Sequence, residues 1–369
     1  MGKSGKTVRP VVLLGGGHAH VEVVRRLGQL GLGAQITLVS PSRYAPYSGM
    51  LPGHIAGEYS FADFHIDLAQ LCARNGVTFL ETSATGIAPE RREVSLESGE
   101  DLTYGLLSID IGSTPSLPEG ISAGISVKPI ASFTDRLARL DDLAAEGGPI
   151  HLAIVGQGVA GVEIAFALSR RFVGGGRDIR ITLLGRAAGP VPERSRRSRR
   201  LVEQALQKEG IVHRPDFDVV ALQDNELTAR DGQRLPIDEV IWTTSSGAPA
   251  WLRQTGLALD AGGFIRVDEM LRSVSHPDIL AAGDVASLQD PRPKAGVFAV
   301  RQGPVLAENI HLCLMGKPLK AYRPQQFWLV LISLADESAI ADKWGLAISG
   351  SWVARWKRRT DCRFMQRYR

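Results

Sequence analysis

Apolar runs of strand length recur along the chain, and a glycine-rich turn follows several of them. The first run covers 11–14 and the next covers 35–40, with apolar positions at helical spacing over about 19–30 between them. Gly31 and Gly33 are typical residues for the end of that helix. The pattern therefore predicts strand, turn, helix and strand, which is how a doubly wound α/β sheet begins.

The same succession restarts further along the chain, with a strand at 151–155, a helix at 159–172 and a strand at 179–184. The similarity of 11–40 to 152–184 predicts two related units rather than a solenoid. Further strands are expected at 106–111, 238–243 and 279–281.

Residues 41–60 interrupt this regular pattern because they are rich in Pro, Gly and Tyr, including the run 46–53. So many breakers predict an ordered loop that lines a site. The tail from about 321 is richer in Trp and Arg than the rest of the chain.

Both glycine-rich turns have the spacing of a dinucleotide-binding turn. Gly15 and Gly17 follow the first strand, and Gly156, Gly158 and Gly161 follow the restarted one. In such turns the first glycine permits the tight bend and the second lets backbone N–H groups approach a pyrophosphate at the helix start. Two such turns predict two nucleotides held face to face, as in an electron-transfer flavoenzyme.

Neither turn has the acidic residue that usually ends the second strand and binds a ribose. The first unit offers Ser40 there and has His20 in place of the third glycine, while the second offers Arg186. Without a repelling carboxylate, Arg186 suits the 2′-phosphate of NADPH, so NADPH is at least as well supported as NADH. The alternative is that Arg186 simply faces water.

Two later segments are further candidates. Asp284, after Gly283 at the end of an apolar strand, suits the hydroxyls of a sugar alcohol, although it also suits a turn with a helix N-cap. The segment 293–302 reads as a helix start that stabilises negative charge on a reduced ring, or as an ordinary amphipathic helix. No metal site is predicted, because no carboxylate at ligand spacing accompanies the histidines at 18, 20, 54 and 65.

The amino-acid composition limits the classes of protein to which the chain can belong. With 369 residues, 44% hydrophobic residues and a net charge of +4, the chain suits a soluble protein with no general nucleic-acid role. No apolar run of about 18 residues and no secretory signal is present, so we expect a cytoplasmic protein. No close cysteine pair indicates a disulfide scaffold or a zinc site; the cysteines are Cys72, Cys313 and Cys362.

Together, several stretches resemble the pyridine nucleotide–disulfide oxidoreductase superfamily. The chain is most similar there to the branch of type II NADH dehydrogenases and sulfide:quinone oxidoreductases, and to the flavoprotein module fused to the N-terminus of some selenide, water dikinases. The matching stretches are 15–22, 46–53, 108–115, 294–302 and 352–357.

The resemblance implies an α/β protein with two doubly wound dinucleotide-binding (Rossmann-like) domains, glutathione-reductase-like, and a small C-terminal segment. The implied FAD-binding domain has two parts, 8–115 and 249–320. The implied NAD(P)-binding domain covers 116–248, and a C-terminal segment with a basic aromatic helix covers 321–369.

The resemblance also implies roles for residues. Asp284 would hold the ribityl chain of FAD, Pro46 and Val297 would flank its ring, and Glu163 would lie near the nicotinamide. The implied FAD-binding residues are Gly15, Gly17, His18, Ala19, Ser40, Pro46, Gly112, Gly283, Asp284 and Val297. Those for NAD(P)H are Gly156, Gly158, Gly161 and Arg186, and the catalytic ones are Glu163, Val297 and Phe298.

The implied function is that of an FAD-dependent oxidoreductase that accepts hydride from NAD(P)H and passes electrons to a quinone or similar acceptor. The cysteine pair of the disulfide reductases is missing. A chalcogen oxidoreductase acting on sulfide or selenide stays open as an alternative, although the scattered cysteines argue against it. A non-enzymatic flavin redox sensor also stays open, and a link to selenium metabolism rests on analogy alone.

Two basic segments have no role in this scheme. Arg194–Arg200 is predicted to be the solvated start of a helix. The tail has aromatic residues near one helical side, among many Arg and Lys: Trp352, Trp356, Phe364 and Tyr368, with Val353. Docking of this helix on the flavin domain, with the Arg side chains snorkelling, is slightly favoured over peripheral contact with an anionic membrane. Formation of a homodimer is left open.

Overall fold

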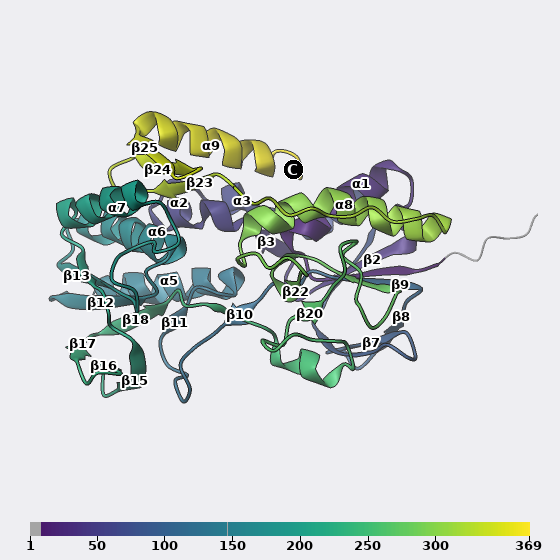
Figure 1. Ribbon diagram of the computed structural model, residues 1–369, viewed down its shortest axis with the longest axis horizontal. Helices are drawn as coiled ribbons and strands as arrows, with labels where there is room; N and C mark the ends of the chain where they lie inside the picture. The colour runs from purple at the N-terminus through teal and green to yellow at the C-terminus, as the bar shows by residue number, and fades with distance from the viewer. Residues whose placement is uncertain (1–8, 146) are drawn as a thin grey trace, which may run out of the picture.

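Two five-stranded parallel sheets organise the part of the chain that our computed structural model describes, residues 9–145 and 147–369 (Figure 1). In the first sheet, β1 pairs with β2 so that Val11 faces Ile36 and Leu14 faces Val39. Its order is β21 (Ile279–Ala281), β9 (Leu106–Ile109), β1 (Val11–Leu14), β2 (Ile36–Ser40) and β5 (Thr78–Glu81).

The second sheet repeats this arrangement with β12 at its centre. Its order is β11 (Ile125–Ser126), β18 (Glu239–Trp242), β12 (Ile150–Val155), β13 (Ile179–Leu184) and β14 (Val212–Arg214). The central strands are buried on both faces, which is why they read as unbroken apolar runs in the sequence. The predicted α/β class with two doubly wound units is confirmed, and the strands predicted at 11–14, 179–184 and 279–281 have the predicted bounds.

Helices cover these sheets. With the first sheet lie α1 (His18–Gln29), α4 (Leu68–Arg74) and α8 (Gly296–Met315). With the second lie α5 (Ile130–Ala145), α6 (Val159–Leu168) and α7 (Arg196–Lys208). The helix predicted at 159–172 ends at Leu168 and continues as one π-helical turn, Ser169–Val173.

Small antiparallel sheets complete the two halves. The three-stranded ones are β6 (Ala84–Ala88), β7 (Glu93–Leu96) and β8 (Asp101–Thr103), and β15 (Val219–Gln223), β16 (Glu226–Ala229) and β17 (Arg234–Pro236). Two-stranded antiparallel pairs are β3 (Tyr44–Pro46) with β4 (His65–Asp67) and β10 (Thr114–Pro115) with β19 (Ser246–Gly247), whereas β20 (Ile265–Arg266) and β22 (Ala286–Ser287) pair in parallel. The β10–β19 pair joins segments that leave the two parallel sheets. Short 3₁₀ turns lie at Gly33–Gln35, Ser48–Met50, Ala250–Gln254 and Gly283–Val285.

The prediction that 41–60 lines a site is in line with the cavity described below, which residues 41, 42 and 44–49 line, but the prediction that it is a loop without regular elements is wrong. The segment holds β3, a 3₁₀ turn and the short helix α2 (Leu51–Ile55), and α3 (Phe61–Phe64) follows. Pro52 lies in the first turn of α2, where its missing N–H costs no hydrogen bond. The buried side chains of Leu51 and Ile55 hold this helix in the core.

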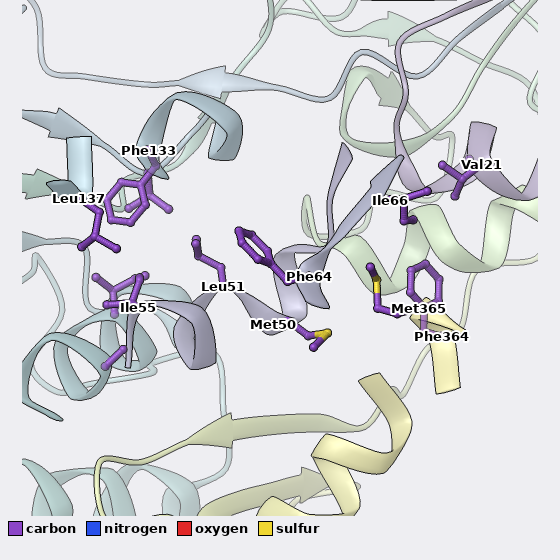
Figure 2. Close-up of a cluster of buried hydrophobic side chains, with 14 of the residues drawn as sticks. Val21, Met50, Leu51, Ile55, Phe64, Ile66, Phe133, Leu137, Phe364 and Met365 are labelled. Carbon is purple, nitrogen blue, oxygen red and sulfur yellow. The ribbon is translucent and has the colours of Figure 1, made fainter. Parts of the chain in front are cut away.

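One hydrophobic core runs through both halves. Figure 2 shows Leu51 and Ile55 near Phe133 and Leu137 of α5 in the second half. It also shows Phe364 and Met365, from the C-terminal helix, near residues of the first half. The two halves and the C-terminal helix are therefore packed on a shared set of apolar side chains.

The C-terminal segment is a three-stranded antiparallel sheet followed by a helix. The elements are β23 (Val330–Ser333), β24 (Ala339–Lys343), β25 (Leu346–Gly350) and α9 (Ser351–Met365). They lie above the second half in Figure 1, with α9 outermost and reaching toward the first half. Val353, Phe364 and Tyr368 are buried, whereas Trp352 and Trp356 are exposed, so only part of the predicted aromatic side docks on the protein.

Candidate functional site

A cavity of about 1960 Å³ extends from the first glycine turn to α6 and beneath α9. Its walls come from the carboxyl-end loops of the first sheet, the start of α8, the first turns of α6 and the C-terminal segment. Doubly wound sheets bind ligands at this edge of their strands. Since ligand pockets usually measure about 300–1,000 Å³, the cavity has room for more than one ligand.

The predicted residues divide into three groups by position. Lining the cavity are Gly15, Gly17, His18, Ser40, Pro46, Gly112, Glu163, Asp284 and Val297. Behind the lining are Ala19, Gly283 and Phe298; the Phe298 ring packs edge-on, at 5.0 Å, against Trp328, which does line the cavity. Around the second glycine turn, outside the lining, are Gly156, Gly158, Gly161 and Arg186.

The second turn is a close-packed strand-to-helix connection. A side chain at Gly161 would collide with the carbonyl of Gly156, so the helix can approach the strand only with glycine there. The side chain of Gln157 is buried, with Nε2 donating to the Ala187 carbonyl at 2.7 Å and Oε1 lying 2.8 Å from His213 Nε2. Arg186, just after β13, is exposed.

Asp284 has a cationic partner that sequence reasoning missed. Lys128 Nζ donates to Asp284 Oδ2 at 2.7 Å and to the hydroxyls of Ser113 and Ser246 at 2.9 Å each. Ser113 also donates to Asp284 Oδ2, at 3.1 Å. Lys128 follows β11 and carries no motif, so only the fold brings it to this carboxylate.

The two histidines of the first turn have different surroundings. His20 bonds the Gly15 carbonyl through Nδ1 at 2.7 Å and Ser108 Oγ through Nε2 at 2.8 Å, so both ring nitrogens have hydrogen-bond partners within the protein. His18 lies against Tyr47 and Phe364, and its buried Nε2 has no hydrogen-bond partner among the described residues. Burial lowers the pKa of His18 to about 4, although Asp284 opposes the change, so the ring is neutral near pH 7.

Asp110 is a second residue that sequence reasoning missed as a site residue. It directly follows β9, and its Oδ2 accepts from the backbone N–H groups of Ala19 at 2.8 Å and His20 at 3.2 Å. Burial raises its pKa to about 7, the two N–H donors oppose the rise, and Asp284 adds to it. The residue lies within the stretch 108–115 that carried the family resemblance, which was the available signal.

The amino end of α8 opens into the cavity. Gly296 and Val297 line it, and no side chain of the described residues caps the helix at Ala295. The N–H groups of the first turn and the helix dipole therefore offer a site for negative charge. Lys294, just before the helix, donates to the Ala286 carbonyl at 2.7 Å and lies 4.0 Å from the centre of the Phe264 ring.

The cavity wall also carries a buried ionic cluster between α6, α9 and the segment after β3. Lys357 Nζ donates to the Gly49 carbonyl at 2.6 Å and to Asp361 Oδ2 at 3.1 Å, and lies 4.0 Å from Glu163 Oε1. Tyr47 donates to Asp361 Oδ1 at 3.3 Å. Burial raises the pKa of Glu163 and of Asp361. Burial also opposes the charge on Lys357, but these two carboxylates outweigh it and hold the pKa of Lys357 above its usual value.

No group of three His, Cys, Asp or Glu residues in the described ranges could hold a metal ion. Cys72, Cys313 and Cys362 all lie outside the cavity lining that the structure describes. No helix within residues 9–145 and 147–369 is long and apolar enough to cross a bilayer.

Comparison with known proteins gives consistent findings. The family profile described as pyridine nucleotide-disulphide oxidoreductase matches residues 9–303. An NADH dehydrogenase-like protein of Mycobacterium tuberculosis is 27% identical over 89% of this chain and 86% of its own length. A demethylphylloquinone reductase of Synechocystis is 26% identical over 92% of this chain and 88% of its own. Among solved structures, the sulfide:quinone oxidoreductase of Aquifex aeolicus superposes with a TM-score of 0.83 and 20% identity, covering 98% of this chain and 91% of that one.

Proposed function

Because the chain belongs to the pyridine nucleotide-disulphide oxidoreductase family, we propose that it is an FAD-dependent oxidoreductase that takes hydride from NAD(P)H and reduces a quinone or similar acceptor. The observation that carries the proposal is the continuous cavity that joins the first glycine turn, the start of α8 and Glu163 of α6. The relatives named NADH dehydrogenase-like protein and demethylphylloquinone reductase support this chemistry.

The residues of the first half fit FAD. Gly112 has open space where a side chain would stand. His18, whose Nε2 has no hydrogen-bond partner among the described residues, also lines the cavity. Asp284 and Ser113 offer oxygen atoms for the hydroxyls of a sugar alcohol. We assign 8–115 and 249–320 to FAD binding and 116–248 to NAD(P)H binding, with 321–369 as a C-terminal segment.

Bound FAD supplies the redox chemistry, by accepting hydride and releasing electrons to the acceptor. The protein supplies position and charge. The uncapped start of α8 at Gly296 and Val297 stabilises negative charge on a reduced ring. Phe298 acts through Trp328, whose place in the cavity wall it fixes.

Glu163 of α6 and Lys357 of α9 line the same cavity, and they would hold the nicotinamide end of NAD(P)H there. Ser333 donates its N–H to Glu163 Oε1 at 2.9 Å, so one carboxylate oxygen is fixed in place. Glu163 orients the nicotinamide in this scheme, and Lys357 keeps the buried carboxylates compensated for charge.

Anaerobic mixing of the FAD-loaded protein with NADH, NADPH or sulfide, one at a time, tests the proposal. We expect NADH or NADPH to bleach the visible flavin absorbance, and a soluble quinone to restore the colour. Bleaching by sulfide alone would support the chalcogen alternative instead. Slow turnover with every acceptor, together with a protein that binds in only one flavin state, would support the redox-sensor alternative.

For the C-terminal segment we propose peripheral contact with an anionic membrane. Along α9 the exposed positions Trp352, Arg355, Trp356, Arg359 and Arg363 recur at helical spacing, so they share one face. An aromatic and basic face of this kind favours the surface of an anionic bilayer. Trp344, Leu346 and Ile348 on the preceding hairpin also expose their side chains.

A further inference from the structure

The carboxyl group of Asp110 takes the place of an N-cap for α1. The cap residue is Gly17, which has no side chain, and Asp110 Oδ2 instead accepts from the N–H groups of Ala19 and His20. These are the second and third residues of the helix, the donors that an N-cap side chain normally satisfies. A side chain at Gly17 would collide with this carboxyl group, so glycine is needed there to admit Asp110.

The same helix end is where the pyrophosphate of a dinucleotide binds in this fold. Asp110 also lines the cavity, beside Gly15, Gly17 and Gly112. An ionised Asp110 would thus place a negative charge next to the two negative charges of a pyrophosphate, at a buried position where charges are weakly screened. A neutral Asp110 carboxyl group keeps both N–H bonds through Oδ2 and removes the repulsion.

Among the residues that the structure describes, the charged and titratable groups around Asp110 do not supply a compensating cation. Asp284 lies across the Gly283 turn and adds negative charge, and Lys128 is already paired with Asp284. His18 and His20 belong to α1, and burial lowers the pKa of each to about 4, so both rings are neutral near pH 7. Asp110 is therefore the group in this corner that changes charge near neutral pH.

We propose that Asp110 is a positioning residue that takes up a proton when FAD binds, so that cofactor loading and protonation are linked. The proposal rests on the proposed binding of FAD in the first half. The proton comes from solvent and resides on Oδ1, since Oδ2 accepts the two N–H bonds. The O–H bond on Asp110 forms as the bond between the proton and its donor, water or a buffer acid, breaks, and no electrons are exchanged.

The sign of the pH dependence follows from this linkage. Below about pH 7 Asp110 is already protonated in the free protein, so FAD affinity is flat. Above that pH the free protein must gain the proton on binding, and the dissociation constant rises by about tenfold per pH unit. The rise ends at the still higher pKa that Asp110 has in the complex.

The test is titration of apoprotein with FAD between pH 6 and pH 9, followed by flavin fluorescence. We expect the rise described above for the unaltered protein. Asp110→Asn, which has the same shape and no charge to lose, is expected to bind FAD with little change across the range, and more tightly than the unaltered protein at the alkaline end. Asp224→Asn, at an exposed turn outside the cavity, is the matched control and should keep the full pH dependence.

Calorimetry in buffers of different ionisation enthalpy gives a second readout that needs no variant. We expect the number of protons taken up per FAD bound to rise from near zero at pH 6 toward one at the alkaline end of the range. FAD binding without proton uptake, or with the same pH dependence in Asp110→Asn, overturns the role of Asp110 and leaves the proposed function standing. Folded apoprotein that binds no FAD at any pH overturns the proposed function as well.

Discussion

At the residue scale, the first half of the site depends on two carboxylates, Asp284 and Asp110, whose negative charges are compensated in different ways. Asp284 has Lys128 and the Ser113 hydroxyl around it, so its charge is compensated before any ligand arrives. Asp110 has backbone N–H donors and a pKa near 7. The two residues lie on either side of Gly283, so their charges are coupled.

We expect Asp284→Ala to yield folded protein with little bound FAD, because the variant loses the acceptor for ribityl hydroxyls and leaves Lys128 uncompensated. Loss of a charge-assisted hydrogen bond costs about 1.5–3 kcal/mol, which is about ten- to a hundredfold in affinity. The measurement is the ratio of flavin to protein absorbance after purification. Asp290→Ala, which removes an exposed carboxylate outside the cavity lining, should keep its colour; a fully yellow Asp284→Ala protein would contradict the assignment.

Arg186 decides between the two pyridine nucleotides in our proposal. Arg186→Ala should raise KM for NADPH by about tenfold, because an exposed charge-assisted bond to the 2′-phosphate is lost, and should leave KM for NADH nearly unchanged. Steady-state kinetics with both nucleotides measures the effect. Arg180→Ala, an exposed position within β13, is the control. Equal KM values for NADPH before and after the change would mean that Arg186 only faces water.

Several residues that the sequence singled out by local chemistry line one cavity, and their roles stay predictions. Gly15, Gly17, Asp284 and Val297 all lie on one cavity, as strand-end and helix-start positions do in a doubly wound fold. Lys128 could not be found this way, because its meeting with Asp284 depends on the path of the connection between the two sheets.

At the element scale, strands were easier to predict than short helices. A strand buried on both faces is a continuous apolar run, so β1 and β21 have the bounds that the sequence predicted. Between residues 41 and 60, the elements are only three to five residues long and are held by tertiary packing. Propensity is weak over such lengths, so Pro and Gly misled the prediction. The β23–β25 sheet was not predicted, because its short strands pair only within the folded C-terminal segment.

Helix α9 is expected to join the protein to a membrane surface through its exposed face. Trp352→Ser with Trp356→Ser should lower the fraction of protein that floats with anionic liposomes, because two exposed indole rings no longer insert at the interface. Flotation with neutral liposomes should be weak for both proteins. Thermal unfolding should change little, since neither ring is buried. Equal flotation of the variant and the unaltered protein would contradict the proposed contact.

At the scale of the whole molecule, segments of both halves and of the C-terminal segment line the cavity, from the first glycine turn to Arg367. Filling it should therefore stabilise the protein as one unit. We expect FAD at about 100 times its Kd to add about 2.7 kcal/mol to the free energy of unfolding of the apoprotein. A calorimetric scan with and without FAD measures this. Riboflavin or AMP alone should stabilise less at the same concentration, since each fills only part of the site; equal effects would argue against a dinucleotide site.

The discontinuous first sheet has a consequence for synthesis. Strand β9 pairs with β21, but residues 110–278 lie between the end of β9 at Ile109 and the start of β21 at Ile279, and the whole second sheet is drawn from that interval. On the ribosome, the first sheet therefore stays open at its β9 edge until β21 has left the exit tunnel. We infer that the second sheet of the nascent chain forms before the first sheet is complete. During that interval the unpaired edge of β9 is exposed, and this is when we expect a chaperone to bind the chain.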